Sequence, residues 1–315
     1  MISVIIPVYN VEKYIKRAFN SLLTQTIGFE NLEIIFIDDN STDSCPEIIK
    51  EYADKYENVK AFFLDENSGY AGKPRNVGLT HATKEFVMFL DPDDYFMDDA
   101  CETLYHHIAF DDLDVVCGVH SDGESVPEWI LLNVLTDCQK PWDIRYKKYT
   151  DMVKDSNFEL KIDSVDEYPS VIAAANIWDK IFRRSFIEVN NIRFPEAIPA
   201  EDSVFLVDSF LNAQGIKFIN KIIVRHDYGR ADSLQHQFSK TKIIKRIEAY
   251  YKMFYLFMDK NKTDIFKHYL LVIKLRHVLV DYIMKCNLPT GDILEILMYV
   301  KPLFKLYCDY GGLIP

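Results

Sequence analysis

The acidic cluster Asp91-Pro92-Asp93-Asp94 has the residue types and the spacing of a metal site. Two carboxylates at positions i and i+2 of an extended chain point the same way, so together they can bind a divalent cation through oxygen. Mg²⁺ or Mn²⁺ held in this way keeps positions open for phosphate oxygens. The cluster therefore predicts a metal–diphosphate site, although the same letters also fit a polar turn that caps the next helix.

Two further polar segments have the chemistry of a nucleotide site. Segment 38–43 (DDNSTD) offers a carboxylate, Asp39, that can accept from a nucleobase imide N–H or a ribose hydroxyl. Segment 67–76 (NSGYAGKPRN) combines two glycines with Lys73 and Arg75 just before a helix, an arrangement that suits a diphosphate. Its spacing matches neither the P-loop nor the dinucleotide-binding fingerprint. A helix cap by Ser41 or Asp43 is the alternative explanation for the first segment, but such a cap does not need Asp38 or Asp39.

A second type of chemistry is suggested by Glu201 and Asp202, which precede an apolar helical run. One of these carboxylates could act as the general base for an attacking hydroxyl, whereas a helix cap is the alternative. His226 and Arg230 follow a predicted strand and could reach phosphates, a metal or an acceptor. A lone histidine is more often a structural hydrogen-bonding group.

The elements that must position these side chains alternate between strand and helix. Apolar, β-branched runs predict strands at 2–8, 32–37, 59–64 and 85–90, and helical patterns fill 11–26, 43–56, 72–82 and 98–110. This alternation predicts a parallel, doubly wound α/β sheet, in which ligands bind beyond the carboxyl ends of the strands. Weaker patterns further along predict helices at 171–181 and 203–211, strands at 113–119 and 216–224, and helices at 240–258, 264–284 and 292–307.

Charge and cysteine usage narrow the class of protein. The 315 residues contain 36 Lys and Arg against 48 Asp and Glu, a net charge of −12 that argues against general nucleic-acid binding. Residues 236–315 are the exception, with 13 basic and 7 acidic side chains. None of the six cysteines forms a CxxC pair, and neither a secretory signal nor an apolar stretch of about 18 residues is present. We therefore expect a cytoplasmic protein with reduced thiols.

Together these segments resemble the family 2 glycosyltransferases with the GT-A fold, over about residues 2–234. The resemblance is carried, in the family's order, by ISVIIPVYN (2–10), IDDNSTD (37–43), NSGYAGKPRN (67–76), FLDPDD (89–94), WDKIFRRS (178–185) and AEDSVF (200–205). It is closest to bacterial transferases that build or decorate surface polymers, teichoic-acid glycosyltransferases among them. It implies a Rossmann-like, mostly parallel sheet, a UDP-sugar donor and a divalent metal, Mn²⁺ or Mg²⁺.

The resemblance also implies a role for each matching residue. Asp202 would be the catalytic base, Asp93 would hold the metal, and His226 is a weaker candidate for a second metal ligand. Tyr9 would lie against the uracil, and Asp39 would accept its N–H. The nucleotide-sugar site would comprise Pro7, Val8, Tyr9, Asn10, Asp39, Asn67, Arg75 and Asp91. The acceptor site would comprise Asp179, Lys180, Glu201 and Arg230.

These expectations define a domain plan and a reaction. A GT-A domain at 1–235 would divide into a nucleotide-sugar half, 1–118, and an acceptor half, 119–235, followed by a basic, aromatic-rich helical region at 236–315. The reaction would be inverting transfer of a sugar to a hydroxyl of a glycan or lipid-linked polymer in cell-surface polysaccharide synthesis. The helical region would close the cleft, form a homodimer, or contact the inner face of the membrane through 239–307.

Two other classes remain as alternatives. A sugar-nucleotide pyrophosphorylase shares the layered α/β plan, but it needs a Gly-rich loop after the first strand, where this chain has Tyr9 and Asn10. A non-catalytic subunit that binds nucleotide sugars would be favoured by loss of Asp93 or Asp202, and both are present. No motif specifies the donor sugar or the linkage, because the shape of the pocket sets that selectivity.

Overall fold

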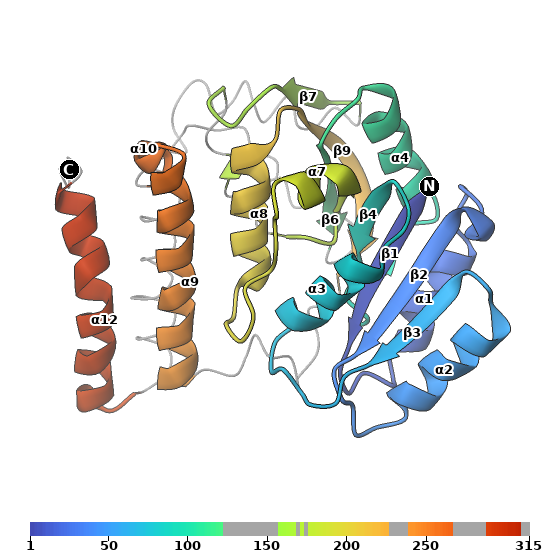
Figure 1. Cartoon of the computed structure of the whole chain (residues 1–315), viewed down its shortest axis with the longest axis horizontal. Helices are drawn as coiled ribbons and strands as arrows, with labels where there is room; N and C mark the ends of the chain where they lie inside the picture. The colour runs from blue at the N-terminus through green and yellow to red at the C-terminus, as the bar shows by residue number, and fades with distance from the viewer. Residues whose placement is uncertain (122–156, 168–170, 173–175, 227–238, 267–287, 310–315) are drawn as a thin grey trace.

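The computed structural model describes residues 1–121, 157–167, 171–172, 176–226, 239–266 and 288–309 (Figure 1). Within these ranges the strands form a mixed sheet in the order β3-β2-β1-β4-β8-β6-β9-β5, and β7 pairs with β9. The strands are β1 (Ile2–Val8), β2 (Leu32–Asp38), β3 (Val59–Phe63), β4 (Phe86–Phe89), β5 (Tyr95–Phe96), β6 (Val115–Ser121), β7 (Glu159–Ile162), β8 (Lys180–Arg183) and β9 (Ile216–Arg225). The α/β class predicted from the sequence is confirmed.

The first half of the sheet is parallel and is covered on both faces. Strands β1 and β2 are buried along their whole length, which explains why they read as continuous apolar runs instead of alternating patterns. The connecting helices are α1 (Ile15–Leu23), α2 (Cys45–Lys55), α3 (Gly72–His81) and α4 (Ala100–Phe110), with a 3₁₀ turn at Phe29–Asn31. Phe19 of α1 stacks on Tyr52 of α2, with ring centroids 4.0 Å apart, and locks these two helices over the strands.

The second half of the sheet is built differently, because β8 runs antiparallel to both of its neighbours, β4 and β6. Ile181 and Phe182 of β8 are fully buried between them. The helix predicted at 171–181 is therefore wrong at its end, where the chain forms strand β8. Helices α7 (Arg184–Val189) and α8 (Glu201–Asn212) follow, and the boundary proposed at residue 118 lies within β6, so one sheet spans both proposed halves.

The C-terminal region consists of helices of which α9 packs on α8, while α10 and α12 pack on α9, as Figure 1 shows. They are α9 (Lys240–Asp259), the short α10 (Thr263–Ile265) and α12 (Thr290–Asp309). The buried side of α9 includes Ile247, Met253 and Phe257, and α12 contributes Ile296 and Val300 to the same hydrophobic core. The helical region expected after residue 236 is present, and it is continuous with the core of the sheet domain.

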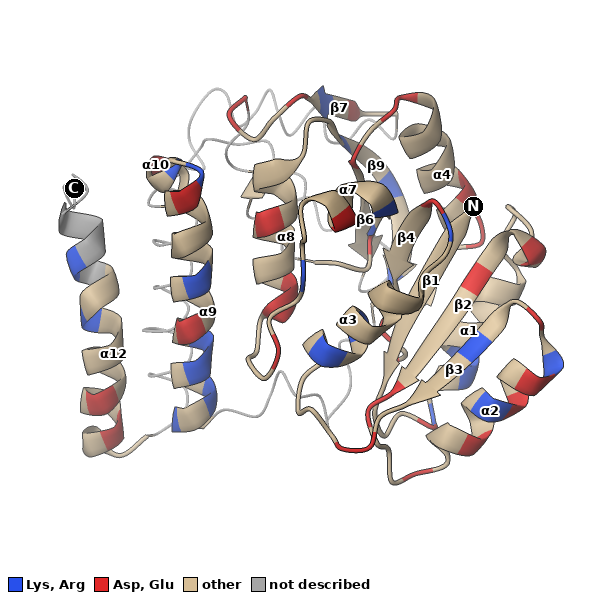
Figure 2. Cartoon of the chain, in the orientation of Figure 1, with Lys and Arg blue, Asp and Glu red and all other residues tan. Residues whose placement is uncertain are grey.

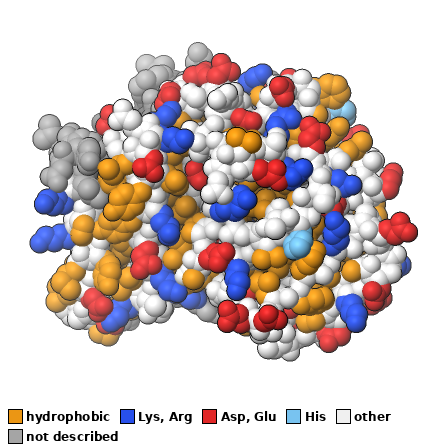
Figure 3. All heavy atoms as spheres, in the orientation of Figure 1, with side chains coloured by type: hydrophobic (Ala, Val, Ile, Leu, Met, Phe, Trp, Pro, Cys, Tyr) orange, Lys and Arg blue, Asp and Glu red, His pale blue; other side chains and the backbone are white. Residues whose placement is uncertain are grey.

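Another side of α9 and α12 is apolar and exposed (Figure 3). Its largest apolar side chains are Tyr255, Leu294, Leu297, Met298 and Tyr299, each at least 40% exposed, and Lys301 and Lys305 lie among those of α12. None of the helices in the part of the chain that the structure describes is long and apolar enough to cross a membrane.

Candidate active site

The loops after β1 and β2 form the first part of the site. Asn10, which follows β1, adopts a left-handed conformation with φ of 51°. Its Oδ1 accepts a hydrogen bond from the Thr42 amide at 2.8 Å, and its own amide donates to Ser41 Oγ at 3.1 Å. These bonds fix the turn and leave the Tyr9 side chain 44% exposed, as an aromatic ring at the edge of the sheet.

Asp39, at the carboxyl end of β2, is buried and bonded to the Gly-rich segment. Its carboxylate accepts from the Ser68 amide at 3.0 Å, from Ser68 Oγ at 2.9 Å and from Asn67 Nδ2 at 3.1 Å. Burial raises the pKa of Asp39, and the donors from Ser68 act in the opposite direction. Neighbouring Asp38 accepts from the Ser41 amide through Oδ2, while its buried Oδ1 has no hydrogen-bond partner among the described residues. The carboxylate oxygens of Asp38 and Asp39 therefore lie together at the carboxyl end of β2, where they can accept hydrogen bonds.

The Gly-rich segment leads into α3, which packs closely against the chain that precedes α8. A Cβ atom on Gly72 would lie 2.4 Å from the Pro195 carbonyl oxygen, so only glycine fits there. Asn76 of α3 donates to the Phe194 carbonyl at 2.8 Å and accepts from the Phe194 amide at 2.9 Å. These contacts bring the start of α3 next to the start of α8.

Arg75 joins the two acidic parts of the site. Its Nη2 lies 2.7 Å from Asp91 Oδ1, and its Nη1 lies 3.1 Å from Glu201 Oε1. The guanidinium is buried, with its centre 5.4 Å from the Phe194 ring centroid. Burial raises the pKa of Glu201. The charge of Arg75 lowers this pKa, and the charge of neighbouring Asp202 raises it further. One cation therefore holds the acidic cluster after β4 beside the acidic start of α8.

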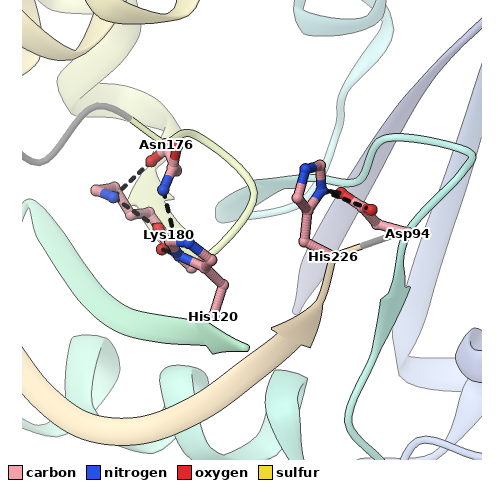
Figure 4. A network of polar contacts seen from close by, with 6 residues as sticks. Asp94, His120, Asn176, Lys180 and His226 are labelled. Atoms are coloured by element: carbon pink, nitrogen blue, oxygen red, sulfur yellow. Dashed lines mark hydrogen bonds and ion pairs between the residues drawn. The ribbon is translucent and has the colours of Figure 1, made fainter. Parts of the chain in front are cut away.

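The acidic cluster after β4 is itself fixed from two sides. Arg17 of α1 donates to the Asp93 carbonyl oxygen and lies over the Tyr95 ring, 5.0 Å from its centroid. Asp94 is fully buried, and its two carboxylate oxygens lie 2.8 and 2.9 Å from His226 Nδ1 (Figure 4). Burial raises the pKa of Asp94 to about 6, although the contact with His226 lowers it. Asp91 and Asp93 are partly exposed at the surface of this loop.

Asp202 occupies the first turn of α8, where the helix dipole favours a negative charge. The residue before the helix, Ala200, has φ of 60°, a left-handed conformation that is unusual for alanine and turns the chain sharply into α8. Asp202 Oδ1 accepts from the following amide, Ser203, at 2.7 Å. The carboxylate is partly exposed, so its second oxygen can reach a hydroxyl group.

Asp179 and Lys180 lie in a buried polar network at the start of β8 (Figure 4). Lys180 Nζ donates to Asp179 Oδ1 at 2.6 Å and to the Asn176 carbonyl, and His120 Nδ1 lies 3.3 Å from Asp179 Oδ2. Burial raises the pKa of Asp179, but Lys180 and His120 outweigh it and hold that pKa below its usual value. Asp179 and Lys180 are each only 2% exposed, so this pair lies beneath the surface of the site. The charge of Asp202 acts on Lys180 and links the pair to the start of α8.

Comparison with known proteins identifies the family. A sequence profile described as "Glycosyl transferase family 2" matches residues 3–160, which is half of the chain. The chain belongs to glycosyl transferase family 2. The match covers the carboxyl edges of β1, β2 and β4, where Tyr9, Asp39 and Asp91 lie.

Two relatives are named as transferases that act on poly(ribitol-phosphate). The poly(ribitol-phosphate) beta-glucosyltransferase of Bacillus spizizenii is 34% identical over 230 residues, covering 72% of this chain and 31% of that protein. The poly(ribitol-phosphate) beta-N-acetylglucosaminyltransferase TarS of Staphylococcus aureus is 36% identical over 220 residues, covering 69% of this chain and 34% of that protein. The chain therefore spans about a third of the length of these curated relatives.

The solved structures show the same fold. The crystal structure of S. aureus TarS 1–349 in complex with UDP-GlcNAc has a TM-score of 0.72 at 25% sequence identity, covering 95% of this chain and 79% of that one. A second structure of the same fragment, in complex with UDP, has a TM-score of 0.71. These matches confirm the GT-A fold with helices at its C-terminal end.

The described residues can hold a divalent cation only if the diphosphate of a bound donor supplies some of its ligands. Among them, no group of three or more His, Cys, Asp or Glu side chains is arranged to hold an ion. Mg²⁺ commonly takes one or two protein carboxylates and completes its shell with substrate phosphates and water. Asp91 and Asp93 are partly exposed on one loop, so they are suited to binding a cation together with the phosphates of the substrate.

The predicted site residues are brought together to different degrees. Arg75, Asp91 and Glu201 lie in direct contact, and Asp39 contacts Asn67. Arg230 lies outside the described residues. Sequence reasoning assigned no role to the supporting residues His120, Asn176, Trp178 and Phe194, and it named Asp94 only as a member of the acidic cluster. Trp178 stacks on His226, with ring centroids 5.2 Å apart, and its only signal was its place in the segment WDKIFRRS.

Proposed function

We propose that the chain is an inverting glycosyltransferase that moves a sugar from a UDP-sugar to a hydroxyl group of a phosphate-containing cell-surface polymer. The observation that supports this most is the Arg75 bridge between Asp91 and Glu201. It brings a carboxylate cluster suited to a metal–diphosphate beside Asp202, a carboxylate suited to deprotonating a hydroxyl. The carboxylates suited to the leaving diphosphate and the carboxylate suited to activating the acceptor therefore lie in one site.

The donor would lie along the carboxyl edge of the parallel strands. The exposed ring of Tyr9 would stack on the uracil, supported by the turn of Pro7, Val8 and Asn10. Asp39, already aligned by Ser68, would accept the uracil N–H. Asn67 and Arg75 would line the ribose and the diphosphate.

A divalent cation bound with the donor would be held by Asp93 together with Asp91, and His226 is a weaker candidate ligand. When bound, Mn²⁺ or Mg²⁺ would neutralise charge on the leaving diphosphate. The chain's own contribution is to fix the loop, because Arg17 holds the Asp93 carbonyl and His226 holds Asp94.

Asp202 would act as the base in a single displacement. Its carboxylate would take the proton of the acceptor hydroxyl as the hydroxyl oxygen bonds to the anomeric carbon. As that bond forms, the bond from the same carbon to the UDP oxygen breaks, UDP leaves with the bonding electrons, and the configuration inverts. One base is enough for this step, whereas glycoside hydrolysis needs two carboxylates that flank the bond.

The acceptor is proposed from the printed names of the relatives, which act on poly(ribitol-phosphate). A hydroxyl of a polyol-phosphate chain, free or carried on a lipid, is the matching chemistry, and Asp179, Lys180, Glu201 and Arg230 would shape its site. We place the reaction in the cytoplasm beside the inner face of the membrane, where a lipid-carried acceptor would be met. The exposed apolar face of α9 and α12 suits either a peripheral membrane contact or a homodimer.

The test is UDP release from a panel of UDP-sugars with Mn²⁺, measured with and without poly(ribitol phosphate). We expect release with one or two of the sugars and an increase when the polymer is added. A pyrophosphorylase would instead produce pyrophosphate from UTP and a sugar phosphate. Binding of a UDP-sugar without any release would favour a non-catalytic subunit and overturn the proposal.

A further inference from the structure

The first two turns of α9 carry a concentrated positive charge. Their sequence, KTKIIKR, contains four cations and no acid, although the chain as a whole has a net charge of −12. Lys240 forms ion pairs with Asp292 and Glu295 of α12, at 3.0 and 2.9 Å. Lys242, Lys245 and Arg246 are spaced i, i+3 and i+4, so they share one side of the helix. We call these three residues the cationic face of α9.

The cationic face meets the candidate active site directly. Lys245 Nζ donates to the Ala197 carbonyl at 3.1 Å, on the segment that leads into Asp202. The same ammonium lies 5.5 Å from the ring centroid of Tyr70, in the Gly-rich segment. Figure 2 shows α9 beside α8, with blue bands along the lower half of α9 and a red band at the lower end of α8. Through Lys245, the cationic face therefore contacts both the segment that leads into α8 and the Gly-rich segment proposed to hold the diphosphate.

The charge of Arg246 also extends to this border. Burial raises the pKa of Tyr70, Glu201 raises it further, and Arg246 lowers it. The Tyr70 hydroxyl therefore lies within electrostatic reach of both Glu201 and Arg246. Positive charge from α9 and negative charge from α8 thus act on the same side chain.

A phosphate-bearing acceptor has a specific electrostatic difficulty at this site. The carboxylates of Glu201 and Asp91 lie near Asp202, and buried Arg75, which both of them share, offsets only part of their charge, so together they repel a chain that carries a negative charge on every repeat. Productive approach needs fixed cations beside the base to offset this repulsion. Within the described part of the chain, the cationic face of α9 contacts the segment that leads into Asp202.

We propose that Lys242, Lys245 and Arg246 form the subsite that binds the phosphodiester groups of the acceptor polymer next to the hydroxyl that Asp202 deprotonates. This inference rests on the proposed function. It assigns the positive charge of α9 to substrate recognition. The competing use of the same cations, contact with anionic lipid headgroups, is an outcome of the experiment below.

The experiment compares the wild-type chain with the double variant Lys242→Gln/Arg246→Gln. Lys245 is left intact because it supports the Tyr70 loop. Transfer kinetics are measured against poly(ribitol phosphate) and against the UDP-sugar, at two salt concentrations. The matched control is Lys50→Gln/Lys55→Gln, which removes two exposed cations from α2. We expect KM for the polymer to rise about fivefold to tenfold in the first variant only, with KM for the donor unchanged.

Salt supplies a second measurement that needs no variant. The KM of the wild type for the polymer should rise steeply with salt, and the double variant should lose part of that dependence, because fewer phosphate contacts are screened. Equal polymer KM values in the double variant and the wild type would overturn the inference while leaving the proposed function intact. Loss of binding to phosphatidylglycerol vesicles with unchanged polymer KM would assign the cations to lipid and also overturn it. Absence of transfer by the wild type would instead defeat the proposed function.

Discussion

The donor edge and the acceptor side of the site are built by opposite strategies. At the donor edge, Asp39 and Asn10 are fixed by loops that follow neighbouring parallel strands, about 30 residues away in the sequence. Where the donor edge meets the elements of the acceptor side, Arg75 reaches Glu201 across 126 residues, and Asp94 of the metal loop reaches His226 across 132. The contacts at the donor edge need only adjacent βα units, whereas the contacts of Arg75 and Asp94 form only when the whole sheet has assembled.

This difference has a functional meaning. A nucleotide common to many transferases can be held by a repeated local arrangement, because each βα unit presents its polar loop at the same edge. An acceptor differs from enzyme to enzyme, so its side of the site can be supplied by later elements such as α8 and α9. We therefore expect changes at the two sides to separate donor binding from transfer.

The strongest test of that separation is Asp202→Asn. Removing the base should lower kcat by about 10³-fold, because a positioned base contributes 10²–10⁴-fold, while the Kd for the UDP-sugar stays within about twofold. The matched control is Asp208→Asn on the same helix, where burial raises the pKa of the carboxyl to about 6, so the neutral side chain is well tolerated. Equal kcat in Asp202→Asn and the wild type would remove Asp202 from its role.

The junction between the two sides is tested by Arg75→Gln. Loss of this buried cation leaves Asp91 and Glu201 without their shared partner and should lower the free energy of unfolding by about 3 kcal/mol. Chemical denaturation measures the change, and Arg184→Gln, which breaks a partly exposed i,i+4 pair with Glu188 and a hydrogen bond to the Lys84 carbonyl, should cost only about 1 kcal/mol. Adding Glu201→Gln to Arg75→Gln should recover part of the loss. No recovery would mean that the two residues are not energetically coupled.

Glu33 tests a contribution to stability that comes from the donor half alone. It lies at the amino end of β2, away from the carboxyl edge that carries the site. Burial raises the pKa of Glu33, but Lys60, Ser3 and Thr83 outweigh it and lower the pKa to about 2. The unfolded chain then binds more protons in acid, so this stabilisation is present above about pH 5 and lost as the pH falls toward 2. Glu33→Gln should cost about 2 kcal/mol at pH 7 and flatten the acid limb of the stability curve, without changing KM for either substrate. The exposed Glu51→Gln is the control, and an unchanged acid limb in Glu33→Gln would contradict the assignment.

The smallest expected effect is at Tyr9. Removing an exposed ring that stacks on a base should weaken UDP-sugar binding by about fivefold, which is about 1 kcal/mol. Calorimetry on Tyr9→Ala and Tyr9→Phe measures it, and the phenylalanine should restore binding because the stacked face is kept. Tyr255→Ala, on the exposed face of α9, should have no effect. If Tyr9→Ala bound donor as tightly as the wild type, the nucleoside would not lie against this ring.

The sequence predicted best what is local in the chain. Strands β1, β2 and β4 were predicted within one or two residues, because buried parallel strands are continuous apolar runs, and their polar ends marked the edge of the site. Strand β8 was missed because Ile181 and Phe182 take their conformation from pairing with β4 and β6. The Arg75 bridge was missed for a related reason, since no spacing rule connects residues 126 positions apart.

The central claim is that Asp202 deprotonates an acceptor hydroxyl that displaces UDP in a single step. The most direct measurement is NMR of poly(ribitol phosphate) after incubation with ¹³C-labelled UDP-sugar, for the wild type and for Asp202→Asn. The account predicts a new β-anomeric signal on the polymer from the α-linked donor, absent in the variant. An α-anomeric signal, or equal labelling of the polymer by both proteins, would contradict it.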